Sequence, residues 1–207
     1  PALQASASGE LIERWLTKQA TLETWSADFT QTRTLKSFAQ PLTAEGKVWF
    51  AAPNRFRWEL GQQTIAVRQP EQMLVLYPRL KRVEKYPLTG NQMGPWRDAL
   101  SLLEAGFPRS RKELDDQFKI HEVIEKDGNA ELVLEPKAAG ARRMMPQIRI
   151  VFSIEDLQLR ATQLHFADGS IMRNDFRNPK VNETIDSSLF NPPIPGDFKV
   201  VEPLKKP

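Results

Sequence analysis

The side chains that could perform acid–base or nucleophilic chemistry are few in this sequence, and they form no catalytic pattern. The two histidines, His121 and His165, lie far apart in the chain and outside any metal-binding or catalytic-triad motif. The acidic pairs Asp115-Asp116 and Glu155-Asp156 consist of adjacent residues, whose side chains do not face one another. Cysteine is absent, which excludes thiol catalysis, disulfides and thiolate metal sites. No phosphate-binding, dinucleotide-binding or serine-hydrolase motif occurs, so we expect no enzyme, no catalytic residues, no cofactor and no metal site.

Basic residues are clustered at positions 79–85 and 137–143, and the second cluster is expected to lie in a glycine-containing loop. The net charge of +3 is too small to indicate nucleic-acid binding, and neither cluster contains the interleaved aromatic residues of a single-strand groove. Solvated faces are the simpler interpretation, and docking patches for an acidic partner or a membrane surface are the alternative. We therefore expect no nucleic-acid partner.

The residues with a distinctive pattern are aromatic and lie between positions 46 and 60. Phe56 and Trp58 alternate with charged residues, which is typical of a strand with one apolar face. Trp49 lies on the preceding strand of the same predicted hairpin, whose turn falls at positions 51–54. The pattern is compatible with a sheet packed on its own core or with the floor of an apolar ligand site.

Helical spacing of apolar residues at the start of the chain predicts a helix over about 8–20. Ser8 is the expected N-cap residue, and Trp15 belongs to the stripe that must pack against the sheet. No apolar run is long enough to cross a membrane.

Alternating patterns and turn signals predict about ten or eleven short antiparallel strands. They fall at 24–35, 42–51, 54–60, 64–69, 72–77, 81–86, 118–125, 130–136, 147–153, 157–166 and 171–176, with a last short strand at 198–201. The strand at 72–77 is apolar on both faces, so both faces should be covered. A helical insert over about 96–117 interrupts the strands, and Ser110 with Glu113 forms a capping-box pattern within it.

These elements predict a single domain over 1–207, mainly β with some α. We expect an incomplete, unclosed antiparallel β-barrel, covered by the N-terminal helix and a short helical lid. The apolar cavity between sheet and cover should bind acyl chains, because burial is favourable by about 0.8 kcal/mol per methylene group. Its predicted lining is Phe29, Trp49, Phe56, Trp58, Met73, Val75, Leu102 and Leu103.

Four stretches give the sequence a resemblance to the periplasmic outer-membrane lipoprotein carrier family LolA. They are Ala27-Asp-Phe-Thr-Gln31, Gly46-Lys-Val-Trp49 with Pro53-Asn54-x-Phe56-x-Trp58, Leu132-Val-Leu-Glu-Pro-Lys-Ala138, and Leu189-Phe-Asn-Pro-Pro193. The resemblance implies a half-barrel closed by a helix and a lid. It also implies a periplasmic chaperone that takes acylated lipoproteins, or another lipid, from an inner-membrane transporter to an outer-membrane receptor.

The sequence departs from the family pattern at Ala52, where the family has an arginine that holds the lid. Arg55 and Arg57 could replace it, although strand alternation points them away from the cavity. A second functional interpretation is an envelope-stress sensor, a regulatory module with the same half-barrel. We expect a monomer, located in the periplasm, whose start at Pro1 follows a removed signal peptide or a trimmed N-terminus.

Overall fold

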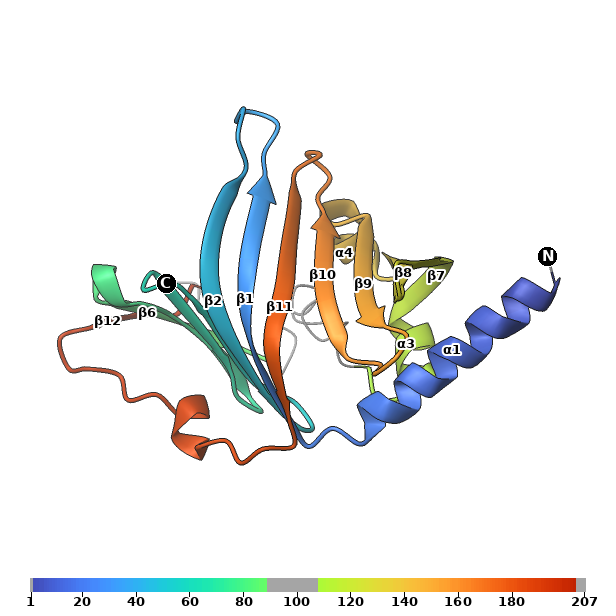
Figure 1. Cartoon of the computed structure of the whole chain (residues 1–207). Helices are drawn as coiled ribbons and strands as arrows, with labels where there is room; N and C mark the ends of the chain where they lie inside the picture. The colour runs from blue at the N-terminus through green and yellow to red at the C-terminus, as the bar shows by residue number, and fades with distance from the viewer. Residues whose placement is uncertain (1, 89–107, 204–207) are drawn as a thin grey trace. The chain divides into compact units, whose positions relative to one another are not determined.

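The computed structural model describes residues 2–88 and 108–203, and side chains from residue 8 onward. It contains one twelve-stranded sheet and an N-terminal helix, α1 (Figure 1). The strands are hydrogen-bonded in the order β12-β6-β5-β4-β3-β2-β1-β11-β10-β9-β8-β7. Because β12 and β7 end this order and are not paired with each other in the described residues, the sheet is not closed into a barrel.

Apart from α1 (Ala2–Ala20), the described helices are short. They are η1 (Pro78–Leu80), α3 (Arg111–Gln117), α4 (Ala139–Met144) and η2 (Ser187–Phe190). The first six strands are β1 (Thr24–Thr34), β2 (Leu42–Ala51), β3 (Arg55–Leu60), β4 (Thr64–Arg68), β5 (Gln72–Tyr77) and β6 (Arg82–Pro87). The others are β7 (Phe118–Lys126), β8 (Asn129–Pro136), β9 (Gln147–Ser153), β10 (Leu159–His165), β11 (Ile171–Val181) and β12 (Lys199–Val201).

The predicted fold class, mainly β with an unclosed sheet and an N-terminal helix, is confirmed. Twelve strands are described: the eleven predicted between 24 and 176, and the last short strand predicted at 198–201, which is β12. The sheet is not purely antiparallel, because β12 pairs with β6 in parallel. Strand β11 extends to Val181, five residues beyond the predicted end at 176.

Two local predictions are wrong. Helix α1 begins at Ala2, so Ser8 lies inside the helix and is not its N-cap. Residues 2–7 include three alanines, the residue with the strongest helix propensity, which explains the earlier start. The predicted loop at 137–143 contains α4, which buries Ala141. No helix among the described residues has the length and hydropathy needed to cross a bilayer.

The second half of the predicted insert is helical as expected. The Ser110 hydroxyl accepts a hydrogen bond from the Glu113 amide at the start of α3, and the Glu113 carboxylate accepts one from the Arg109 amide. The first half of the insert, 96–107, lies outside the described residues, and so do the predicted site residues Leu102 and Leu103.

The described residues fall into two compact units. Unit 1 contains those within Pro1–Thr21, Gln31–Thr43 and Asp98–Phe176, and unit 2 those within Leu22–Thr30, Ala44–Arg97 and Arg177–Pro207. In unit 1, α1 packs on the sheet through Trp15, whose ring stacks on that of Phe152 with centroids 4.8 Å apart. Both rings are fully buried, so this contact fixes α1 against β9.

Unit 2 contains β3 to β6, β12 and parts of β1, β2 and β11. Four consecutive residues of β5, from Met73 to Leu76, are each at most 5% exposed although they alternate between faces. Both faces of this part of the sheet are therefore buried, as the sequence predicted.

Candidate functional site

Cross-strand pairing in unit 2 places most of the predicted apolar site residues on one face of the sheet. Directly paired residues in antiparallel strands project from the same face. One row across β2 to β5 consists of Phe50, Phe56, Arg68 and Met73. The next row consists of Val48, Trp58, Ala66 and Val75. We call the surface formed by these rows and Phe29 the aromatic face.

Phe29 joins the aromatic face from β1. Its ring centroid lies 4.2 Å from that of Trp58, with 37° between the ring planes. The ring occupies space above Gly46, where an added Cβ would overlap both Phe29 and the Glu59 carbonyl oxygen. A glycine is therefore required at position 46 for Phe29 to contact Trp58.

Trp49 does not belong to the aromatic face. It pairs with Arg57, and it lies between Val48 and Phe50, which project from the opposite side of β2. The structure thus brings together five of the eight predicted lining residues: Phe29, Phe56, Trp58, Met73 and Val75. It places Trp49 on the other face.

The opposite face of unit 2 is covered by the segment that follows β11. Val67, Leu74, Leu76 and Val83 form a buried cluster there, with Ile194 packed against it. Arg57 Nη1 donates a hydrogen bond to the Leu189 carbonyl oxygen at 3.0 Å, and the Arg55 guanidinium lies 5.2 Å from the centroid of the Phe190 ring. These contacts show that this face is a structural core.

The turn between β2 and β3 contains Ala52, the position where the family arginine is absent. Arg55 and Arg57 are engaged on the opposite face, as strand alternation predicted. Arg68 reaches this turn from the aromatic face, and its Nη1 donates to the Asn54 carbonyl oxygen at 2.9 Å. Sequence reasoning missed Arg68. The signal available was the hairpin of β3 and β4, which pairs Arg68 with Phe56.

A polar cluster of four residues continues the aromatic face onto β6. Its members are Tyr77, Arg82, Glu84 and Tyr86, which pair with one another or with the rows of the aromatic face. The Tyr86 hydroxyl donates to Glu84 Oε2 at 2.6 Å, and Arg82 Nη2 lies 2.5 Å from Glu84 Oε1. Glu84 and Tyr86 are only 9% and 7% exposed.

The environment of this cluster keeps both phenols protonated. Burial and the hydrogen bond to Glu84 raise the pKa of Tyr86, and burial and the negative charge of Glu84 raise the pKa of Tyr77. Sequence reasoning missed the cluster because it assigned the charged residues at 79–85 to a solvated face. Val83, between Arg82 and Glu84, is buried in the core under the opposite face.

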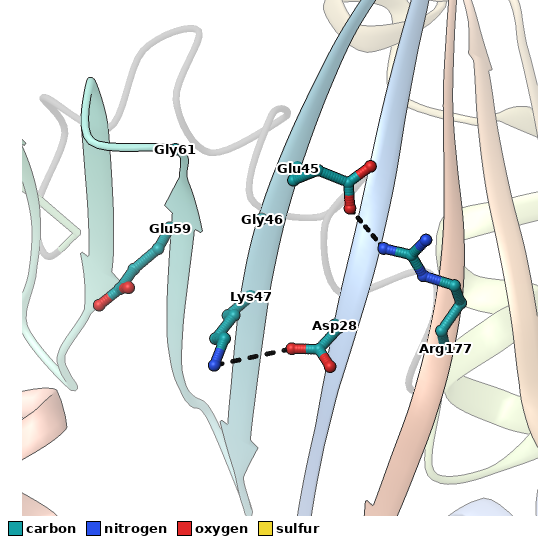
Figure 2. Close-up of a pocket in the computed structure, with 7 residues that line it drawn as sticks. All are labelled: Asp28, Glu45, Gly46, Lys47, Glu59, Gly61 and Arg177. Carbon is teal, nitrogen blue, oxygen red and sulfur yellow. Dashed lines mark hydrogen bonds and ion pairs between the residues drawn. The ribbon is translucent and has the colours of Figure 1, made fainter.

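A pocket of about 350 Å³ in unit 2 has a different character (Figure 2). Lys47 pairs with Glu59 across β2 and β3, so both project opposite to the aromatic face. Figure 2 shows Lys47 directed at Asp28, at 3.8 Å, and Glu45 directed at Arg177, its ion-pair partner. Hydrogen bonds from Thr30 and Arg177 lower the pKa of Glu45. The lining consists of glycine and paired charged side chains, which is a poor match for an acyl chain.

The fold and the site define the class of this protein: it is a mainly β protein with an unclosed sheet, an N-terminal helix and an aromatic face. The sequence matches the family model described as "Outer membrane lipoprotein carrier protein LolA" over residues 20–193. The chain therefore belongs to the LolA family. A search of curated proteins gave no match.

Solved structures of low sequence identity share the fold. An uncharacterized conserved protein from Thermus thermophilus has 10% identity and a TM-score of 0.54, covering 95% of this chain and 99% of its own. A DUF1329 family protein from Desulfovibrio piger has 12% identity and a TM-score of 0.51, covering 89% of this chain and 96% of its own.

Proposed function

We propose that this protein is a carrier that binds the acyl chains of lipoproteins, or of another lipid, on its aromatic face. It acts as a monomer in the periplasm, accepts its cargo from an inner-membrane transporter and passes it to an outer-membrane receptor. Membership of a family of lipoprotein carriers supports this role. The observation that carries it is the contact of Phe29 with Trp58 above Gly46, within two rows that are apolar except for Arg68.

Apolar transfer provides enough free energy for such a role. Removing a sixteen-carbon chain from water gives on the order of 12 kcal/mol, before the costs of ordering the ligand and opening the site are subtracted. The cargo is therefore held without a covalent bond, and it can pass to a receptor that offers an equivalent apolar surface.

Native mass spectrometry of the protein, purified from a periplasmic extract and then exposed to lipid, tests the proposal. We expect a bound acylated species with the wild type and its loss with Trp58→Asp, which places a carboxylate on the apolar face. Trp49→Asp is the matched control, because its side chain lies on the other face of the neighbouring strand. A wild type that binds no lipid but retains a protein partner would support the sensor in place of the carrier.

A further inference from the structure

The polar cluster lies where the aromatic face ends, with Tyr77 at the end of β5 and its other three residues on β6. Glu84 pairs directly with Val75, and Tyr86 pairs with Met73. Glu84 is three strands away from Trp58, a distance of about 14 Å at the usual strand spacing. An extended acyl chain that lies across the row from Trp58 to Val75 would bring its polar end to Glu84.

The cluster is not explained by protection of a sheet edge. Charged residues often prevent unwanted pairing at edge strands. Here β12 already covers the β6 edge, pairing Lys199 with Arg82 and Val201 with Glu84. Placing Glu84 and Tyr86 in a buried position on the aromatic face therefore requires another reason, because burial of a carboxylate is costly.

The cluster can still accept a hydrogen bond and donate one. A carboxylate can accept about four hydrogen bonds, and the described contacts of Glu84 with Tyr86, Arg82 and Tyr77 account for three. Arg82 Nε is buried and has no hydrogen-bond partner in the described part of the chain. A ligand group that both donates and accepts would satisfy the carboxylate and this N–H together.

We propose that Tyr77, Arg82, Glu84 and Tyr86 bind the neutral polar end of the acyl ligand, an amide or hydroxyl group that donates and accepts hydrogen bonds. This inference rests on the proposed carrier function and adds the chemical class of the ligand. A free fatty acid is disfavoured, because its carboxylate would lie beside the buried Glu84. A simple ester is held less tightly, because it has no donor for Glu84.

The test compares three probes with the same chain: 1-palmitoylglycerol, methyl palmitate and palmitate. Affinities are measured by displacement of a neutral fluorescent acyl probe. The wild type should bind palmitoylglycerol about tenfold more tightly than either other probe, the effect of one hydrogen bond to a charged group. In Glu84→Gln and Tyr86→Phe the preference for palmitoylglycerol over the other two probes should fall to about twofold.

Two controls separate the possible failures. Glu59→Gln breaks the ion pair between Glu59 and Arg57. This pair has the same two-residue spacing along its strand as Glu84 and Arg82, but it projects from the opposite face of the sheet. The preference for palmitoylglycerol should therefore remain. Both tyrosines of the chain belong to the cluster, so palmitoylglycerol should also change the tyrosine absorption of the folded protein. Equal affinity for the three probes in the wild type would overturn the ligand class and leave the carrier function standing. Failure of all three probes to bind would reject the carrier function itself.

Discussion

The ring of Phe29 lies against that of Trp58, with centroids 4.2 Å apart. This contact is possible only because Gly46 has no side chain. Strand β1 contributes Phe29, β2 contributes Gly46 and β3 contributes Trp58. This contact at the centre of the aromatic face is thus built by three successive strands, and it depends on one glycine.

Gly46→Ala should therefore destabilise the protein. The added methyl group would overlap the Phe29 ring and the Glu59 carbonyl oxygen, so the ring must leave Trp58. Overpacking of this kind costs about 1–3 kcal/mol. Denaturant unfolding measures the loss. Gly9→Ala in α1, where an added Cβ meets nothing within 4 Å, should instead stabilise the protein by up to about 1 kcal/mol.

The two tyrosines should titrate at higher pH than free tyrosine, which ionises near pH 10. Burial and Glu84 hold both protons more tightly in the folded state, so the unfolded state loses them first as the pH rises. The free energy of unfolding should consequently be unaffected below about pH 10 and decrease above it. Alkaline titration of the phenolate absorbance measures this, and Glu84→Gln should shift the transition toward the ordinary range. An unshifted titration in the wild type would mean that the phenols are solvated.

Replacing an arginine on one face of unit 2 should accelerate amide exchange only in the segment that this arginine contacts. Arg57→Met removes the hydrogen bond to the Leu189 carbonyl oxygen, so amide exchange in the segment around η2 should accelerate about 5- to 30-fold. Acyl-probe affinity should be unchanged. Arg68→Met removes the hydrogen bond to Asn54, so it should accelerate exchange near the β2–β3 turn and leave the η2 segment protected. Hydrogen exchange with mass spectrometry distinguishes the two patterns, and identical patterns would contradict the assignment of faces.

Most strands could be predicted from the sequence because alternation and turn residues are local signals. The ranges of β2, β5 and β9 match the prediction residue for residue. The start of α1 could not be predicted from Ser8, because its capping preference competes with the helix propensity of the residues before it.

The composition of the site was harder to predict than the fold. Alternation along one strand shows that Trp49 and Phe50 face opposite ways, but the register of β2 on β3 decides which residues share a face with Trp58. The same limit applied to β6. Its alternation was visible, but only pairing with β5 shows that Glu84 and Tyr86 continue the aromatic face, and only the covering segment around Ile194 explains why Val83 is buried on the other.

The most direct test of the central claim is contact quenching of tryptophan fluorescence by a brominated acyl chain, using dibromopalmitoylglycerol. Bromine quenches an indole only when the two are close together, so the measurement reports which tryptophan the chain contacts. If acyl chains bind the aromatic face, Trp58→Phe should lose a large part of the quenching seen in the wild type. Trp49→Phe, which alters the opposite face of the adjacent strand, should retain it. Full quenching in Trp58→Phe, with loss in Trp49→Phe, would contradict the account.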